Sequence, residues 1–491
     1  MRIIKILITG VVCGLILFHT WPLKIISVDS IPKVGETFDE YAVLWSGMSL
    51  ANGGLPVGWT TNLGAYSPNF PGSSLKGTNL EVQGKTPNWT RIKNVPMPGI
   101  AVVEYDYGLG KKQIALVQPY FDHPPLAGLI YTWGAKNDNK SLIDITPDQL
   151  RAIPRYVSLV TAGLTGILGY LLYGATGGIA AVALYSTMPS TVFSGRMVLT
   201  ENVISPLMLL AMIILKLAKS RGNVKLFAGA GLVSGAAMLS KFPGIGVLVA
   251  GVVWGVKEKI SWKYLIIFLA SGLFIGGLYV IYGLWIAPQL FIRVMLAQAG
   301  RGLWGTVNLW EAVGRLWFLD FPIDGWWIGG WLVLIYLGTK AAHFLPVIFA
   351  ATYILSVTLF GGGNSAWYFF PLGAVFCLLW AGLINEIRLK PNWINLGLLF
   401  FFGFSSSWYW GYAQYHTAGN PTNIIRIGAL VLVMLKIIGE RWGNKFNWST
   451  LIWPILLVII LHRMYVWNFR GIQYLLTNWS RLPYPSAFSK Q

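Results

Sequence analysis

Long apolar runs recur along this chain, and they constrain its fold more than any other feature. A run of about 20 apolar residues is long enough to cross the hydrocarbon core of a bilayer as a helix. Runs of this kind, some of them shorter, occupy residues 4–22, 154–173, 177–194, 199–217, 226–240, 243–256, 264–287, 326–339, 343–361, 366–385, 393–410, 424–439 and 450–466. The sequence therefore predicts an all-α polytopic membrane protein with about 13 transmembrane helices.

The composition supports this class. Only 11% of the 491 residues are charged and 55% are hydrophobic, whereas about 25% of the residues in soluble domains are charged. The formal net charge is +19, but basic residues of a membrane chain usually lie in loops beside anionic headgroups, so we expect no nucleic-acid partner. Cys13 and Cys377 both lie in apolar runs, which excludes a disulfide framework and a cysteine-based metal site.

The distribution of Lys and Arg in short loops predicts the orientation. Connections such as 216–225 and 257–263 are basic, and basic short loops face the cytoplasm, together with the N-terminus of the chain. The sequence then predicts a plasma (inner) membrane protein with these parts: a first transmembrane helix (1–22), a large extracytoplasmic loop with two interfacial helices (23–153), helices 2–7 (154–287), an extracytoplasmic loop (288–325), helices 8–13 (326–466) and an extracytoplasmic tail (467–491).

The first interfacial helix is predicted in FDEYAVLWSGMSLANGG, which begins with two adjacent acids. Thr37 and Glu40 have the spacing of a capping box, which gives Glu40 a structural role. Apolar residues then recur at three- and four-residue steps, which predicts an amphipathic helix on the membrane surface. Asp39 lies in the first turn, where a carboxylate stabilises the helix dipole, so these residues alone leave open whether Asp39 is structural or functional.

The second interfacial helix is predicted in YFDHPPLAGLIYTW. Pro124 and Pro125 suit the first turn of a helix, and Asp122 or His123 would precede it as a cap. The segment VVEYDYG before it adds two more acids, Glu104 and Asp106. The secondary candidates for an acid or for an acceptor site are therefore Glu40, Glu104, Asp106, Asp122 and His123.

A further capping box introduces the second membrane span. Thr146 and Gln149 have the required spacing, and we expect one unbroken helix from there into the span. Arg151 and Arg155 are one turn apart on it, which predicts that both lie at the level of the lipid headgroups.

Several of these segments resemble one family of membrane enzymes. The stretch from Asp39 to Pro56, the HPPL segment after Asp122 and the arginines that enter the second span resemble the GT-C superfamily of glycosyltransferases. The sequence is similar more narrowly to the dolichyl-phosphate-mannose protein mannosyltransferases and the aminoarabinose transferases. Further matching segments are SGRMVLTEN (194–202), GLVSGAAMLSKFPGIGVL (231–248) and WYFFPLGAVF (367–376), while an insert at 57–103 departs from the pattern.

The resemblance implies a chemistry. Members of this family take a sugar from a polyprenyl-phosphate donor, and by resemblance Asp39 is the catalytic carboxylate. A hydroxyl acceptor on a protein, lipid or glycan needs one base, while the phosphate leaves without strong acid assistance, so a single carboxylate suffices for an inverting displacement. A retaining mechanism, with a second carboxylate as nucleophile, stays open.

The donor phosphate requires cations at the outer membrane level. Arginine in particular suits phosphate oxygens. The candidates are Arg155, Arg196, Lys241, Arg293 and Arg301. Each of them could instead extend to lipid headgroups, and Arg196 could form a structural ion pair with Glu201.

Cofactors and rival classes complete the predictions. No HExxH or DxD string occurs, so we expect no required metal or other cofactor. The main alternatives are another transferase or ligase of lipid-linked oligosaccharides, a polytopic transporter, and a non-catalytic membrane subunit. The polar residues gather in the predicted outer loops rather than at mid-membrane, which favours the glycosyltransferase over the transporter.

Overall fold

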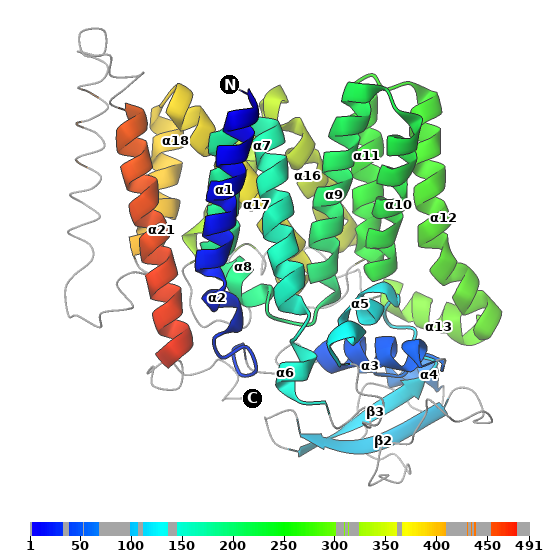
Figure 1. Ribbon diagram of the computed structural model, residues 1–491. Helices are drawn as coiled ribbons and strands as arrows, with labels where there is room; N and C mark the ends of the chain where they lie inside the picture. The colour runs from blue at the N-terminus through cyan, green and yellow to red at the C-terminus, as the bar shows by residue number, and fades with distance from the viewer. Residues whose placement is uncertain are drawn as a thin grey trace.

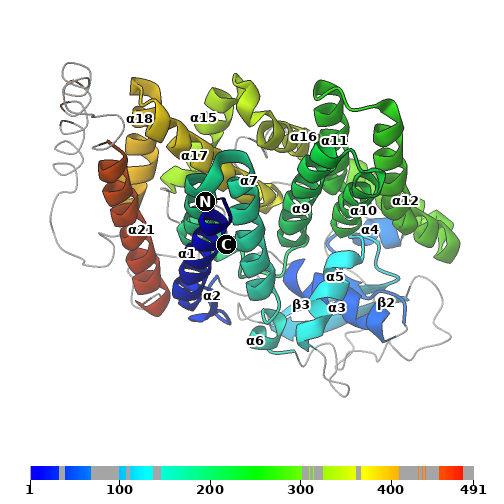
Figure 2. The same ribbon diagram turned by 45° about the horizontal axis from the view of Figure 1, so that its top comes forward.

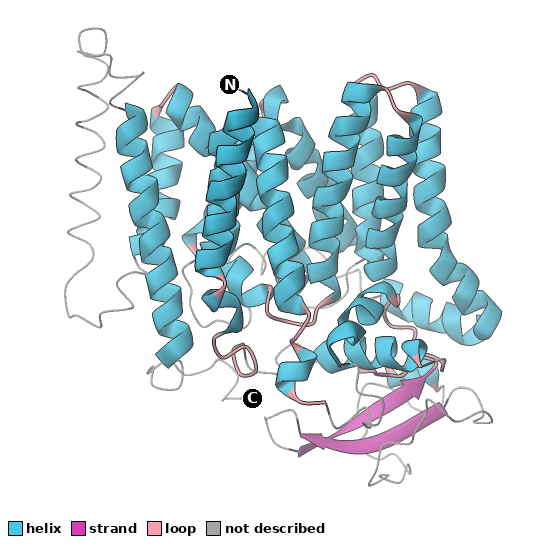
Figure 3. Cartoon of the chain, in the orientation of Figure 1, coloured by secondary structure: helices cyan, strands magenta, loops and turns pink. Residues whose placement is uncertain are grey.

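The computed structural model is a bundle of membrane-length helices that carries a small domain at one end (Figures 1 and 3). It describes residues 2–32, 39–52, 54–67, 99–106, 111–135, 145–300, 324–360, 366–408 and 453–478, together with the single residues 309, 313, 430, 434 and 437. The small domain lies between α1 and α7 in the sequence, and we call its side of the bundle the domain end. The N-terminus lies at the opposite, far end (Figure 1).

The bundle consists of helices with these bounds: α1 (Arg2–Thr20), α2 (Pro22–Ile25), α7 (Pro154–Thr187), α8 (Pro189–Ser194), α9 (Thr200–Arg221), α10 (Val224–Ser240), η2 (Phe242–Gly244), α11 (Ile245–Lys257), α12 (Trp262–Ile286), α13 (Pro288–Ala299), α15 (Gly325–Gly338), η4 (Ala341–His343), α16 (Phe344–Phe360), η5 (Ala366–Phe369), α17 (Pro371–Leu389), α18 (Trp393–Leu398), η6 (Leu399–Phe404) and α21 (Trp453–Asn478). The turned view shows how they surround α17 and α7 (Figure 2). Since α17 is apolar on every side and almost wholly buried, it forms the centre of the core.

The helix α7 is a hairpin of two membrane limbs. Its backbone is helical except at Gly174, where φ is +73°, a conformation that glycine adopts without strain. The limbs then pack closely through small residues: a Cβ built on Gly166 would lie 2.3 Å from Val182, and one on Gly169 would lie 2.7 Å from the carbonyl oxygen of Gly177. The first limb corresponds to the span predicted at 154–173, and the second limb overlaps the span predicted at 177–194 but ends at Thr187, before α8.

The predicted class, an all-α polytopic membrane protein, is confirmed. Among the described residues, seven helices are long and apolar enough to cross a membrane, and α10, the η2–α11 segment and α15 are shorter apolar helices. The predicted count of about 13 is not confirmed, and the span predicted at 424–439 lies outside the described residues apart from three single positions. The helix α21 runs to Asn478, beyond the span predicted at 450–466.

The small domain contains a sheet that the sequence analysis did not predict. Strands β1 (Gly58–Trp59), β2 (Gly99–Asp106) and β3 (Lys111–Gln118) form an antiparallel sheet in the order β1-β3-β2. The register pairs Gly58 with Val117 and Ile100 also with Val117, so β3 is the central strand. The sheet lies on the side of α3 that faces away from the bundle (Figure 1).

Two crossing helices, α3 (Asp39–Ala51) and α5 (Leu126–Ala135), connect this sheet to the bundle. They meet at two glycines: a Cβ on Gly47 would lie 2.0 Å from the carbonyl oxygen of Gly128, and one on Gly128 would lie 2.5 Å from that of Val43. Every residue of α3 from Glu40 to Ser49 is buried. The prediction of an amphipathic surface helix is therefore wrong, because α5 and the sheet cover the faces that were expected to meet water or lipid.

Two short helices complete the small domain, α4 (Leu63–Tyr66) and α6 (Pro147–Leu150). The capping box at the start of α6 is confirmed, since Thr146 accepts from the Gln149 amide and the Gln149 side chain accepts from the Thr146 amide. The helix does not continue unbroken into the span. The chain turns at Arg151, and Pro154 starts α7.

Candidate active site

Asp39 is the first residue of α3, at the domain end of the bundle. Its side chain is 30% exposed, and its Oδ2 lies 3.9 Å from Nε2 of His123, which is 10% exposed. His123 and the two prolines after it precede α5, so the crossing of α3 and α5 brings the two predicted candidates together. The carboxylate of Asp39 is accessible and also lies in the first helical turn, where the helix dipole favours its ionised form.

A buried ion pair joins α9 to the end of α10. Lys241 follows α10, and its Nζ donates to Oε1 of Glu201 at 2.5 Å and lies 3.6 Å from the centre of the Tyr368 ring. Burial alone would lower the pKa of Lys241, but the charge of Glu201 and the proximity of Tyr368 and Asp39 outweigh burial and raise that pKa. Lys241 therefore stays an ammonium, and its field extends to Asp39.

The acid next to Asp39 has a different environment. Glu40 and Arg151 are both wholly buried and form a two-point ion pair, with Nη2 to Oε1 at 2.6 Å and Nε to Oε2 at 3.0 Å. The amide of Val198 also donates to Oε2 of Glu40 at 3.0 Å. Thr37, the other half of the predicted capping box, lies outside the described residues. This cluster joins α3 to the chain that enters α7 and to the turn before α9.

The prediction that Arg151 lies at the headgroup level is wrong, because Arg151 is fully buried. Besides Glu40, it donates to the carbonyl oxygens of Val28 at 3.0 Å and Pro32 at 2.5 Å. A guanidinium has five N–H donors in a fixed fork, and these acceptors satisfy most of them. Arg151 is therefore the structural centre of the junction between the bundle and the small domain.

Asp122 has a positioning role in this structure. Its carboxylate accepts from the hydroxyl of Thr60 at 2.6 Å and from the hydroxyl of Tyr66 at 3.1 Å. Tyr66 also accepts from the amide of Phe121 at 2.8 Å, and Phe121 in turn is held by Tyr279, whose hydroxyl donates to its carbonyl at 2.9 Å. These bonds fix the chain on which His123 is presented.

Two of the other predicted residues lie in β2. Glu104 and Asp106 pair in register with Gln113 and Lys111 of β3. Because β2 is on the far side of the sheet from α3 (Figure 1), the backbone does not bring these two acids to Asp39.

The predicted cations do not all converge on Asp39. Arg196 is fully buried and donates to the carbonyl of Ile26. Burial and the neighbouring charge of Arg151 lower the pKa of Arg196 to about 9. The alternative ion pair of Arg196 with Glu201 is wrong, since Glu201 pairs with Lys241 instead.

The remaining cations are also dispersed. Arg155 donates to the carbonyl of Ala152 at 2.9 Å, at the start of its own helix. Arg293 lies in α13, and Arg301 lies outside the described residues. Lys241 is the predicted cation whose pKa is raised in part by the charge of Asp39.

The sequence analysis missed Glu201 and Tyr368 as members of this site. Both lie in segments that carried the family resemblance, SGRMVLTEN and WYFFPLGAVF, and this was the available signal. No group of three or more His, Cys, Asp or Glu side chains in the described part of the chain could hold a metal ion. The expectation that no metal is required stays a prediction.

Comparison with known proteins bears on the middle of the chain. Residues 122–285 match the family described as dolichyl-phosphate-mannose-protein mannosyltransferase, which confirms the resemblance seen in the sequence. The matched segment includes His123, Glu201 and Lys241, whereas Asp39 and Tyr368 lie outside it. No curated protein sequence matches the chain.

Three solved structures are similar to this chain over part of its length. ArnT from Cupriavidus metallidurans in the apo state is 15% identical, with a TM-score of 0.44 over 73% of this chain and 67% of that one. ArnT bound to undecaprenyl phosphate is also 15% identical, with a TM-score of 0.43 over 74% of this chain and 69% of that one. The archaeal oligosaccharyltransferase AglB from Archaeoglobus fulgidus, in complex with an inhibitory peptide and a dolichol-phosphate, is 11% identical, with a TM-score of 0.33 over 61% of this chain and 50% of that one. At these identities and TM-scores, the three structures say nothing about individual residues of this chain.

Proposed function

We propose that this protein is an integral-membrane glycosyltransferase that moves a sugar from a polyprenyl-phosphate-linked donor to a hydroxyl acceptor at the extracytoplasmic face. The observation that carries this proposal is the arrangement of Asp39, His123 and Lys241 at one end of the bundle. Asp39 is an accessible carboxylate beside His123, and its charge is one of those that raise the pKa of the buried ammonium of Lys241. The family match over residues 122–285 supports the reaction class.

In this proposal Asp39 is the general base. Its exposed carboxylate takes the proton of the acceptor hydroxyl as the oxygen attacks the anomeric carbon, and the bond from that carbon to the donor phosphate breaks. His123 lies beside Asp39 and orients its carboxylate. Glu201 is neutralised by Lys241 and buried, so it is unsuited to act as a nucleophile, which favours inversion over retention.

Lys241 receives the leaving phosphate. An ammonium has three N–H donors, and Glu201 takes one of them. In this proposal another of them is donated to an oxygen of the leaving phosphate, as a charge-assisted hydrogen bond. Glu201 and Tyr368 hold Lys241 in place in the absence of the donor.

The location of the site follows from the charge bias of the short loops. That bias supports a cytoplasmic N-terminus, and the small domain lies at the opposite end of the bundle (Figure 1). We therefore propose that Asp39 acts on the extracytoplasmic side of the plasma (inner) membrane. The sugar's lipid phosphate would enter from the outer leaflet.

The direct test is sugar transfer by the purified full-length protein in nanodiscs. Two donors with the same prenyl chain are compared, one linked through a monophosphate and one through a diphosphate, with detection of the polyprenyl phosphate released from the first and the polyprenyl diphosphate released from the second. The proposal expects turnover of the monophosphate donor. Turnover of the diphosphate donor alone would show instead a transferase of diphosphate-linked oligosaccharides.

A further inference from the structure

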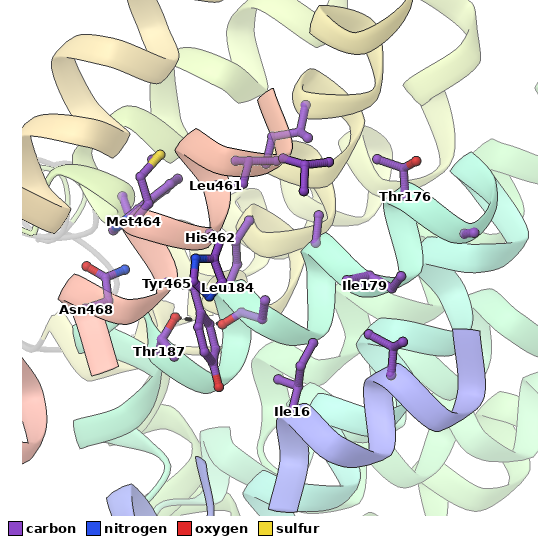
Figure 4. Close-up of a pocket in the computed structure, with 17 residues that line it drawn as sticks. Ile16, Thr176, Ile179, Leu184, Thr187, Leu461, His462, Met464, Tyr465 and Asn468 are labelled. Atoms are coloured by element: carbon purple, nitrogen blue, oxygen red, sulfur yellow. Dashed lines mark hydrogen bonds between the residues drawn. The ribbon is translucent and has the colours of Figure 1, made fainter. Parts of the chain in front are cut away.

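Two features of the bundle lie outside the candidate active site. The first is an apolar pocket of about 520 Å³ between α1, α7 and α21, with Ile16, Ile179 and Leu461 on its wall (Figure 4). None of the described residues that line it is a Lys, Arg, Asp or Glu, so its lining does not select a ligand by charge. The second is a basic surface at the far end of the bundle, whose charge and position both indicate a ligand.

This surface is built from two connections between helices. Residues 219–225 lead from α9 into α10, residues 257–263 lead from α11 into α12, and both connections lie at the far end (Figure 1). Lys219 of the first forms an ion pair with Glu258 of the second. The hydroxyl of Tyr264 donates to the carbonyl of Gly222 at 3.2 Å, and its ring stacks on that of Phe227 with the centroids 5.0 Å apart. These contacts hold the two connections together as one surface.

The charge of this surface is unbalanced. Glu258 is the one acid in residues 219–225 and 257–263, and Lys219 already pairs with it. The other basic side chains of these segments are exposed and form no ion pair within the described part of the chain; we call them the basic patch, and they are Arg221, Lys225, Lys257, Lys259 and Lys263. Their like charges repel one another, so an anionic ligand is attracted by several cations at once.

The basic patch lies where the apolar outer faces of two helices end. On α11, Lys257 is four residues after Val253, which is 38% exposed, so both side chains share one face of the helix. On α12, Lys263 is three residues before Ile266, which is 62% exposed. Trp262 beside it is 68% exposed, and tryptophan is typical of the boundary between membrane and water. The patch therefore lies at the level of lipid headgroups, because exposed apolar faces of membrane helices contact lipid chains.

We propose that the basic patch binds the headgroup of an anionic membrane phospholipid. Acyl chains lie along the exposed apolar faces of α11 and α12, and the phosphate oxygens accept charge-assisted hydrogen bonds from ammonium groups of the patch. A cluster of about four to eight basic residues next to membrane helices is typical of such recognition. The bound headgroup offsets the repulsion among the five cations. This site lies at the opposite end of the bundle from Asp39 and does not depend on the proposed sugar transfer.

The test measures lipid binding by the purified full-length protein. Delipidated protein in detergent is titrated with phosphatidylglycerol or with phosphatidylcholine of the same acyl chains, and native mass spectrometry gives the dissociation constants. Lys257→Gln/Lys263→Gln removes two charges of the basic patch. Lys5→Gln/Lys390→Gln is the matched control, because both lysines are exposed and lie outside the patch, in α1 and directly after α17.

The wild-type protein should bind phosphatidylglycerol about tenfold more tightly than phosphatidylcholine. The patch variant should lose about tenfold of its affinity for phosphatidylglycerol, and the control should keep its affinity. Lys225→Gln/Lys259→Gln removes the same charge from the patch, so it replaces the first variant if that variant does not fold. Equal weakening in the patch variant and the control would overturn the proposal, since it would reflect the total charge of the protein alone.

Two competitors identify the source of the anion. Inorganic phosphate and a polyglutamate peptide, each added at the concentration of the lipid, should leave phosphatidylglycerol bound. Displacement by inorganic phosphate would show a site for a free anion, and tighter binding of polyglutamate than of phosphatidylglycerol would show a surface for an acidic protein. Either result would overturn the proposal.

Discussion

Asp39 and Glu40 are adjacent in the chain, yet they belong to two different regions of the molecule. The active-site region contains Asp39, 30% exposed, with His123 at 3.9 Å. The junction contains Glu40, wholly buried and bonded to Arg151 and to the amide of Val198. Successive residues of a helix point about 100° apart, so one turn of α3 presents one acid to an open space and the other to the protein interior.

The two environments suit the two acids to different roles, Asp39 to chemistry and Glu40 to stability. An accessible carboxylate can exchange protons with an acceptor, whereas a buried carboxylate in a two-point ion pair holds three segments together. Removing one partner of a buried pair leaves an uncompensated charge, which is costly even where the pair itself adds little net stability. Substitutions in the junction should therefore change folding, and substitutions at Asp39 should change rate.

The largest stability effect is expected in the junction. Glu40→Gln should lower the free energy of unfolding by about 3–5 kcal/mol, because Arg151 is left buried without its counter-charge. If Glu40 served only in a capping box, Glu40→Gln would lower the free energy of unfolding much less, because Gln also fits that position. Thermal unfolding in detergent measures the difference. The double variant Glu40→Leu/Arg151→Met should recover most of the loss, and unchanged stability of Glu40→Gln would remove the distinction between the regions.

A smaller effect on turnover is expected at the ion pair of the active-site region. Lys241→Gln should weaken use of the donor by about 1.5–3 kcal/mol, since a charge-assisted hydrogen bond to phosphate is lost. The measurement is kcat/KM for the lipid donor. Lys219→Gln is the matched control, because Lys219 forms an exposed pair with Glu258. Equal effects in the two variants would exclude Lys241 from the phosphate site.

The crossing of α3 and α5 gives a third prediction. Gly128→Ala should destabilise the protein by about 1–3 kcal/mol, because its Cβ would meet the Val43 carbonyl at 2.5 Å and push the two helices apart. Gly229→Ala has nothing within 4 Å of the new Cβ and serves as the control. The two variants are compared by thermal unfolding. Equal unfolding midpoints would show that α3 and α5 can move apart at this crossing without loss of stability.

The smallest effect concerns Lys24, a buried lysine in α2 that donates to the hydroxyl of Ser158 at 2.8 Å. Burial, followed by the charge of Arg196, lowers the pKa of Lys24 to about 7. The folded state then binds fewer protons than the unfolded state between this value and the ordinary lysine pKa near 10.4, so stability rises with pH across that window. Lys24→Met should stabilise the protein by about 1 kcal/mol at pH 7 and flatten this dependence. Identical pH profiles of unfolding for the wild-type protein and Lys24→Met would contradict this prediction.

The membrane helices were predictable because their signal is local. Apolar length alone identified α1 and α12, and the spacing of acids, glycines and prolines identified α3 and α5. The hairpin of β2 and β3 also has a local signal, since Ile100, Val102 and Val103 lie in β2 and Ile114 and Val117 in β3, but the sequence analysis predicted no strand there.

The partners of charged side chains could not be predicted from local signals. Arg151 was expected among lipid headgroups, because an arginine near the start of a span usually lies there. Its burial depends on Glu40, more than a hundred positions earlier, and on backbone carbonyls of a third segment. The pairing of Lys241 with Glu201 depends in the same way on the packing of α10 against α9.

The most direct test of the central claim is the rate of sugar transfer by Asp39→Asn, measured beside its thermal stability. Asparagine is nearly isosteric, so the account predicts an unchanged unfolding midpoint and a rate lower by about 10² to 10⁴, the usual contribution of a general base. Transfer by Asp39→Asn at the wild-type rate, from a protein that is folded and monodisperse, would contradict the account and reduce Asp39 to an acid that stabilises the start of α3.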